Sequence, residues 1–234
     1  MTGVLASVTN VDEARIALEA GADIIDLKNP SQGALGALPV SVIEQVVRFI
    51  DGRKPVSATI GDLPMQPAIL CQAVENTVDT GVDIVKVGFF GKDGHAECAQ
   101  ALAPVISRGI KTVAVMFADQ EPDFSLLPVF AASGFYGAML DTADKTAGGL
   151  LSWLDEARLR DFVGMSHNHG LLTGLAGSLR ETDIAALALL GADYLGFRGA
   201  LCSNHRRQAA LDPVRMSFIS RSVAFVQQTE YVND

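Results

Sequence analysis

The sequence predicts one α/β domain over residues 1–234, folded as a closed (β/α)8 barrel, and three observations support this. Eight short apolar segments alternate with eight helical patterns, and 234 residues is a usual length for one barrel. The apolar segments are nearly continuous in hydrophobic residues, as buried parallel strands are. No linker, low-complexity run or block of charge divides the chain. The prediction is therefore a single TIM barrel, with an open doubly wound sheet as the alternative.

The strands are expected where apolar residues run between turn signals. They cover residues 3–8, 21–28, 55–61, 81–90, 111–117, 135–141, 171–177 and 194–201. The helices are expected where caps or three- and four-residue apolar spacing occur. They lie between residues 10 and 21, then at 43–50, 67–80, 94–107, 124–133, 153–170, 180–190, and from Asp212 onward. Asn10, with Glu13 three residues later, predicts the first cap, and Asp212 before Pro213 predicts the last.

A repeated phrase organises three of the strands. Gly-x-Asp followed by an apolar strand begins at Gly21, Gly81 and Gly191. Side chains alternate along a strand, so residues five and seven positions after the glycine point the same way. The first of these positions holds Asp26, Lys86 and Gly196, and the second holds Lys28, Gly88 and Arg198. A repeat that presents different chemistry each time predicts a shared site at one end of the barrel.

Lysines concentrate at the predicted strand ends. The chain has six lysines, and three of them (Lys28, Lys86 and Lys145) lie at or just past the ends of even-numbered strands. Active sites of such barrels lie at the carboxyl ends of the strands, and alternate strands share interior layers. We therefore expect Asp26 and Lys86 in one layer. The layer above is expected to hold Lys28, Asp141 and Arg198.

This combination of amines and carboxylates suits imine chemistry. An amine attacks a carbonyl only when neutral, and burial beside another ammonium lowers the pKa of a lysine. A carboxylate can keep a second lysine protonated as the acid, although such a cluster titrates as a group. The alternative is that these residues are only buried ion pairs of the barrel core, which cost more than aliphatic side chains.

The last two strands end in small residues that are typical of a phosphate site. Gly177, Ser178, Arg198 and Gly199 lie where barrels often bind phosphate through backbone amides and a helix N-terminus. Ser178 could equally form a capping box with Glu181. Arg206 and Arg207 form either a solvated helix start or a second anion contact, and the sequence does not decide between them. The small-residue loop 29–39 is a candidate lid.

Composition excludes several other classes. The net charge of −9 argues against nucleic acid or anionic lipid as a partner. No apolar run reaches the length of a membrane span, and no basic N-terminal stretch predicts a signal peptide. The three cysteines are scattered, which favours a cytoplasmic protein with reduced thiols. We expect no metal, because His167 and His169 do not share a helix face.

The joint motifs resemble those of the (5-formylfuran-3-yl)methyl phosphate synthases of methanofuran biosynthesis, over nearly the whole chain. They are Asp26-Leu27-Lys28-Asn29-Pro30, Ser57-Ala58-Thr59-Ile60-Gly61-Asp62, Lys86-Val87-Gly88, Asp141-Thr142-Ala143-Asp144-Lys145, Ala176-Gly177-Ser178-Leu179 and Arg198-Gly199. The resemblance implies a TIM-barrel lyase that condenses two molecules of glyceraldehyde 3-phosphate with loss of phosphate and water, without metal or organic cofactor.

The same resemblance implies residue roles. Lys28 would form the Schiff base and Lys86 would donate or accept protons, while Asp26, Asp141 and Lys145 match the remaining charged catalytic residues. Two other hypotheses stay open on the residues alone. One is a class I aldolase or isomerase acting on another sugar phosphate, and the other is a non-catalytic sugar-phosphate-binding barrel. Barrels often assemble through their outer helices, so a homo-oligomer is open as well.

Overall fold

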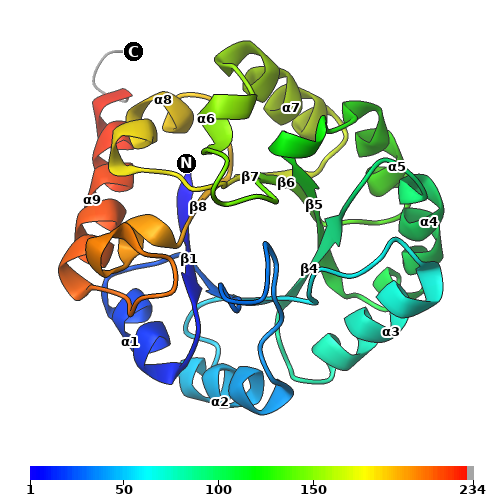
Figure 1. Ribbon diagram of the computed structural model, residues 1–234, viewed down its shortest axis with the longest axis horizontal. Coiled ribbons are helices and arrows are strands. Elements are labelled where there is room, and N and C mark those ends of the chain that lie inside the picture. The colour runs from blue at the N-terminus through cyan, green and yellow to red at the C-terminus, as the bar shows by residue number, and fades with distance from the viewer. Residues whose placement is uncertain (231–234) are drawn as a thin grey trace.

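Eight parallel strands close into a barrel inside a ring of helices, as the computed structural model shows in the view down the barrel (Figure 1). The structure describes residues 1–230, and positions 231–234 of the predicted domain lie outside the described residues. The strands pair in chain order, and β8 pairs with β1 to close the barrel. They are β1 (Gly3–Val8), β2 (Ile24–Leu27), β3 (Val56–Thr59), β4 (Ile84–Phe89), β5 (Lys111–Phe117), β6 (Gly137–Asp141), β7 (Leu172–Leu175) and β8 (Tyr194–Phe197). The predicted fold is confirmed.

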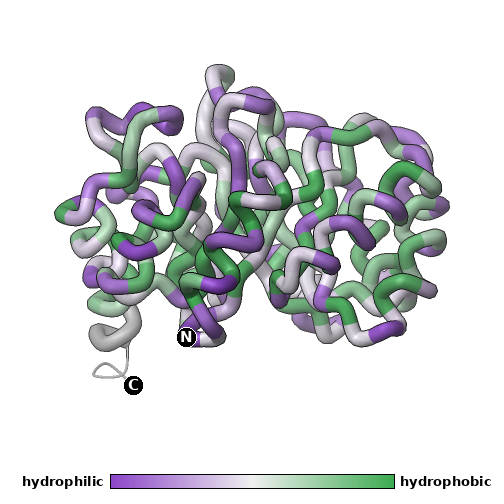
Figure 2. The backbone as a smooth tube through the Cα atoms, turned by 90° about the horizontal axis from the view of Figure 1, so that it is seen from below, coloured by the Kyte–Doolittle hydropathy of each residue, from purple (hydrophilic) through white to green (hydrophobic). Residues whose placement is uncertain are grey.

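The helices follow the strands and cover the outside of the barrel. They are α1 (Val11–Glu19), α2 (Val40–Ile50), α3 (Pro67–Val78), α4 (His95–Ile106), α5 (Leu127–Ala132), α6 (Leu150–Trp153), α7 (Glu156–Asn168), α8 (Ile184–Ala188) and α9 (Pro213–Glu230). Hydrophobic and hydrophilic positions alternate along the chain (Figure 2), and the buried hydrophobic side chains form the core. Within residues 1–230, no helix has the length and apolar character that crossing a membrane requires.

Three expected helices differ from the prediction at their starts, and the one expected over residues 124–133 opens with a 3-10 turn at Phe124–Leu126 before α5. The helix expected over residues 153–170 begins at Glu156, because the Asp155 carboxylate accepts a hydrogen bond from the Arg158 N–H at 2.9 Å and caps α7. The helix expected over 180–190 opens with a 3-10 turn before α8. The strand expected over 194–201 is also shorter than predicted: it ends at Phe197 and a 3-10 turn follows at Gly199–Leu201.

The repeated Gly-x-Asp phrase serves the amino-terminal end of the barrel. Each aspartate precedes an even-numbered strand and accepts a hydrogen bond from a backbone N–H at the start of the odd-numbered strand before it. The pairs are Asp23 with Val4 at 2.9 Å, Asp83 with Val56 at 2.7 Å, and Asp193 with Thr173 at 2.7 Å. These carboxylates satisfy backbone donors that the parallel ladder leaves unpaired at its beginning. The repeated aspartate therefore has a structural role before each strand, while the residues that can take part in a reaction lie at the carboxyl end of the strand.

The loop expected to be a lid lies over the barrel interior. Residues 29–39 follow β2 and reach toward the barrel centre (Figure 1), where the side chains of Ala34 and Leu35 are buried. The Asp62 carboxylate holds the loop by accepting hydrogen bonds from the Ala34 and Leu35 N–H groups at 2.8 and 2.6 Å. A Cβ atom added at Gly33 would lie 2.0 Å from that carboxylate, so the loop needs glycine there.

A buried ion pair joins the start of α1 to the segment after β8. The Asn10 cap is confirmed, because its side chain accepts a hydrogen bond from the Glu13 N–H at 2.9 Å. The Glu13 carboxylate accepts two hydrogen bonds from the Arg198 guanidinium, at 2.6 and 3.2 Å, and one from the Leu211 N–H at 3.1 Å. Both side chains are buried, so removing either one would leave the charge of the other without a partner inside the protein.

Replacing Glu13 by glutamine should therefore destabilise the fold. Leaving the buried Arg198 guanidinium without a counter-charge is expected to lower the free energy of unfolding by about 3–5 kcal/mol, measured by urea denaturation. Asp12→Asn is the matched control, because the Asp12 side chain is 85% exposed in an adjacent position of the same helix. That control should change stability little. Equal losses in the two variants would contradict this account of Glu13.

Candidate active site

A cavity of about 710 Å³ opens at the carboxyl ends of the strands. All the residues that the sequence singled out for catalysis or phosphate binding line it: Asp26, Lys28, Lys86, Asp141, Lys145, Gly177, Ser178, Arg198 and Gly199. They come from β2, β4, β6, β7, β8 and the loops that follow these strands. Parallel strands that close into a barrel bring their ends together around one opening, which explains why residues so far apart in sequence meet.

The lower layer of the site is a buried ion pair held by two hydroxyl groups. The Lys86 ammonium lies 2.7 Å from Asp26 Oδ1. Ser57 donates a hydrogen bond to the same oxygen at 2.6 Å, and Ser7 donates one to Oδ2 at 2.8 Å. The predicted pairing of Asp26 with Lys86 is confirmed. Both oxygens of this carboxylate thus have donors, as a charge buried this deeply requires.

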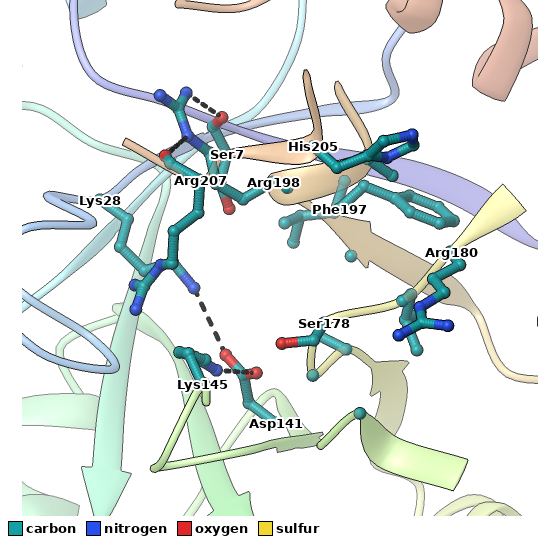
Figure 3. A pocket seen from close by; sticks show the side chains of 18 of the residues that line it. Ser7, Lys28, Asp141, Lys145, Ser178, Arg180, Phe197, Arg198, His205 and Arg207 are labelled. Atoms are coloured by element: carbon teal, nitrogen blue, oxygen red, sulfur yellow. Dashed lines mark hydrogen bonds and ion pairs between the residues drawn. The ribbon is translucent and has the colours of Figure 1, made fainter. Parts of the chain in front are cut away.

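The upper layer contains two lysines that share one carboxylate. Lys28 approaches Asp141 Oδ2 at 3.3 Å, and Lys145 approaches Oδ1 at 2.5 Å (Figure 3). The Thr142 N–H also donates to Oδ1, at 2.8 Å. The predicted approach of Lys28 and Asp141 is confirmed. Lys145, which lies beyond the end of β6, reaches back to the same carboxylate.

A carboxylate in the turn after β5 positions the loop that carries Lys145. Asp119 lies just after β5 and accepts hydrogen bonds from the Ala143 and Asp144 N–H groups, both at 2.7 Å. Sequence reasoning missed Asp119, because nothing in its local pattern connects it to a loop about 25 positions further along. It missed Ser7 and Ser57 as partners of Asp26 for a related reason: their contacts arise from the lateral pairing of β1, β2 and β3.

The two layers perturb the pKa values of their members. Burial alone would raise the pKa of the Asp26 carboxyl, but the ammonium groups of Lys86 and Lys28 outweigh burial and hold that pKa below its usual range. Asp141 follows the same rule, with Lys145 and Lys28 as the opposing charges, and its pKa is also lowered. Both carboxylates therefore stay ionised at neutral pH.

Burial acts on the lysines in the other direction. Loss of hydration lowers the pKa of Lys86, and the Lys28 ammonium adds to this effect against the attraction of Asp26. Burial likewise lowers the pKa of Lys145 to about 8, with Lys28 again acting in the same direction and Asp141 opposing it. Three lysines face two aspartates, so a fully protonated cluster carries one surplus positive charge. Release of one proton from Lys86 or Lys145 removes that surplus, which favours the neutral form of one of these two amines.

Backbone groups at the ends of β7 and β8 form an anion-binding surface. Among the described residues, the N–H groups of Gly177, Ser178 and Leu179 make no hydrogen bond within the chain, and neither do those of Gly199 and Ala200 at the start of the 3-10 turn. Gly177 has φ of +109°, and a Cβ atom there would lie 3.0 Å from the Thr142 side chain. Unpaired N–H groups that line a cavity are suited to an anion.

The predicted capping box between Ser178 and Glu181 is wrong. Asp183 instead accepts a hydrogen bond from the Arg180 N–H at 2.8 Å, and Glu181 pairs with Arg215 at 3.0 Å. Ser178 has φ of +49° and an exposed side chain that points into the cavity (Figure 3). The cap moves by two residues because the left-handed turn at Ser178 delays the start of the helical segment.

The side chain of Arg198 does not face the cavity mouth as predicted. Its N–H groups donate to the Glu13 carboxylate and to the carbonyl oxygens of Ser7, Arg207 and Ala209, at 2.6 to 3.2 Å. A guanidinium has five N–H donors, and these contacts use all five. The expected layer of Lys28, Asp141 and Arg198 is therefore corrected to Lys28, Asp141 and Lys145. Arg198 lines the site but its side chain secures the segment that follows it.

Two weaker sequence candidates lie away from this chemistry. His167 contacts the Asp193 carboxylate at 3.0 Å, at the opposite end of the barrel. Cys202 is fully buried, and burial raises the pKa of its thiol to about 11. In the described part of the chain, no group of three or more histidine, cysteine, aspartate or glutamate side chains is arranged to hold a metal ion.

Solved structures support the fold. The structure of 3-hexulose-6-phosphate synthase from Salmonella typhimurium matches with a TM-score of 0.70 over 96% of this chain and 100% of that chain, at 16% identity. The phosphoribosyl anthranilate isomerase of Thermus thermophilus matches with a TM-score of 0.68 over 97% of this chain and 100% of that chain, at 13% identity. At such identities the likeness concerns the barrel alone.

Sequence comparisons identify the family. A protein of Methylorubrum extorquens is 42% identical over 92% of this chain and 88% of its own length. The (5-formylfuran-3-yl)methyl phosphate synthase of Methanopyrus kandleri is 39% identical over 87% of this chain and 91% of its own, and that of Methanosarcina acetivorans is 34% identical over 96% and 99%. A family model described as 4-HFC-P synthase matches residues 4–220. With the relatives and the family model in agreement over most of its length, the chain belongs to the 4-HFC-P synthase family.

Proposed function

We infer that this enzyme makes (5-formylfuran-3-yl)methyl phosphate from two molecules of glyceraldehyde 3-phosphate, as a step toward methanofuran. Loss of one phosphate and two molecules of water balances the atoms of this condensation. The observation that carries the inference is the cluster of three lysines and two aspartates in one cavity, in a chain of this family. Its surplus ammonium provides both a neutral amine and protonated neighbours, which imine chemistry needs together.

Lys28 is the proposed Schiff-base lysine. Its ammonium lies in the upper layer beside the open part of the cavity, whereas Lys86 lies deeper and pairs with Asp26. The longer 3.3 Å contact with Asp141 leaves Lys28 less tightly held than Lys145, which contacts the same carboxylate at 2.5 Å. Attack of the amine on the first aldehyde, followed by loss of water, would give the imine.

The other charged residues are proposed to move protons. Loss of the proton next to the imine carbon gives an enamine, whose carbon attacks the second aldehyde. Lys86 and Lys145 are suited to take and return these protons, because burial lowers the pKa of both amines toward neutrality. Asp26 and Asp141 would stay ionised and hold the lysines in place. A substrate hydroxyl then closes the ring on the carbon that Lys28 holds and displaces the lysine as the free amine, and elimination of phosphate and water completes the aromatic ring.

The anion-binding surface is proposed to hold a substrate phosphate. The backbone N–H groups of Gly177, Ser178 and Gly199 offer neutral donors in the cavity wall. The acidic surface of the protein makes nucleic acid and anionic membranes poor partners, so the small phosphorylated aldehyde is the partner we propose. We also propose that the enzyme works in the cytoplasm, where triose phosphates occur.

A chromophore assay and chemical trapping test this function together. Incubation with glyceraldehyde 3-phosphate should produce the ultraviolet absorbance of a furan aldehyde, which an aldol product lacks. Borohydride added during turnover should reduce the imine and leave a stable adduct, located by mass spectrometry on the peptide that contains Lys28. Lys28→Arg keeps the positive charge but should lose both the adduct and the activity. An adduct at Lys86 or Lys145, or activity retained in Lys28→Arg, would falsify the assignment.

The lowered pKa of Lys145 predicts a pH-dependent stability. In the folded protein its pKa is about 8, against 10.5 for a free side chain, so between these pH values the unfolded chain binds more protons than the folded one. Stability contributed by Lys145 should consequently rise by about 3 kcal/mol across this window. Urea denaturation of the wild type and of Lys145→Met at several pH values measures the difference. Parallel curves for the two proteins would rule out the proposed titration.

A further inference from the structure

We propose that Arg207 binds the phosphate of the second triose phosphate, at an anion site separate from the backbone N–H groups at the ends of β7 and β8. This inference rests on the proposed function and deepens it. Two phosphorylated aldehydes must occupy the cavity at once, and one surface of backbone donors accounts for only one of their phosphates. The question is which group of the chain receives the other.

Arg207 reaches back into the cavity from the segment after β8. Its side chain lines the cavity and extends toward Lys28 and Asp141 (Figure 3). One Nη2–H donates to the carbonyl oxygen of Gly33, in the loop after β2, at 2.9 Å. Among the described residues this is the only hydrogen bond of its guanidinium, and no carboxylate lies within ion-pair distance of it. Four of its five donors remain available for a ligand.

The surroundings favour an anion beside this guanidinium. The titratable groups that act on it are Asp141, Arg198 and Asp62, and Lys145 is close enough to be affected by its charge. Asp141 is already shared by two lysines, Asp62 binds backbone N–H groups, and Arg198 repels it. Burial and Arg198 accordingly lower the pKa of Arg207. A phosphate would supply the counter-charge that the chain does not provide.

The Glu13–Arg198 ion pair fixes the backbone that carries Arg207. Arg198 Nε donates to the carbonyl oxygen of Arg207 at 2.7 Å, and Nη2 donates to that of Ala209 at 2.9 Å. Arg198 is held in turn by the buried Glu13 carboxylate. The backbone of Arg207 is therefore anchored while its guanidinium keeps free donors, which is how a preorganised ligand-binding residue is built. Arg198 thus acts as a positioning residue for Arg207.

The two anion sites lie on different walls of the cavity. Ser178 and the donors after β7 belong to one wall, whereas the Arg207 guanidinium stands on the side of Lys28 and the loop after β2 (Figure 3). A phosphate at Arg207 would hold the second triose phosphate beside the enamine that forms on Lys28, where the enamine carbon can reach its aldehyde. A guanidinium also suits this task by geometry, since its fork of donors matches two phosphate oxygens at once.

The test compares Arg207→Met with Arg206→Met. The second variant is the matched control, because Arg206 is the adjacent arginine and its side chain is exposed outside the cavity. Equilibrium dialysis with labelled inorganic phosphate should give two bound phosphates per chain for the wild type and for Arg206→Met, and one for Arg207→Met. In the furan assay, Arg207→Met should raise KM about tenfold to hundredfold with kcat changed little. Arg207→Lys should recover part of the loss.

The outcomes separate this inference from the proposed function. A wild type that forms no furan would overturn the proposed function, and the phosphate count would still test Arg207. Furan formation together with an unchanged phosphate count and KM in Arg207→Met would overturn the role of Arg207 and leave the function standing. A fall in kcat alone, with phosphate binding intact, would also overturn it. Circular dichroism and urea denaturation establish that each variant is folded before these comparisons are made.

Discussion

The site depends on one imbalance: three buried ammonium groups face two buried carboxylates. Each aspartate is stabilised as an anion by its lysines, and burial together with the Lys28 ammonium lowers the pKa of Lys86 and Lys145. Neither Asp26 nor Asp141 could remain charged in a barrel interior without these partners. Conversely, an equal number of acids and amines would leave no reason for one amine to become neutral. The surrounding barrel holds these three lysines and two aspartates in fixed positions.

Two kinds of carboxylate keep that geometry. At the amino-terminal ends of the strands, Asp23, Asp83 and Asp193 tie neighbouring strands together. At the opposite ends, Asp62 and Asp119 hold the loops that cover the barrel or deliver Lys145. The acidic composition of the chain therefore has internal uses in addition to its effect on the surface. These hydrogen bonds fix the position of loops that support the reacting groups.

Much of the site could be predicted because it depends on strand periodicity. The alternation that puts Asp26 and Lys28 on one face, and the layer rule that joins β2 with β4, need no knowledge of loops. The prediction failed at Arg198 because β8 ends at Phe197, directly before it, and the Arg198 guanidinium pairs with Glu13 outside the strand. Ser7 could not be found because lateral contacts between strands leave no local pattern, and Asp119 could not because its partners lie in a loop about 25 positions further along. Arg207 lay in a segment whose path the sequence did not reveal.

The buried loop after β2 has a consequence for the fate of hydrogen atoms. Leu35 packs beside Gly88, two residues above Lys86 on the same face of β4, where any larger residue would collide with it. Only 3% of the Lys86 side chain reaches solvent. A hydrogen that this amine removes from substrate would exchange slowly with bulk water and be handed back to the same molecule. Turnover in heavy water should then leave that position enriched in the original isotope.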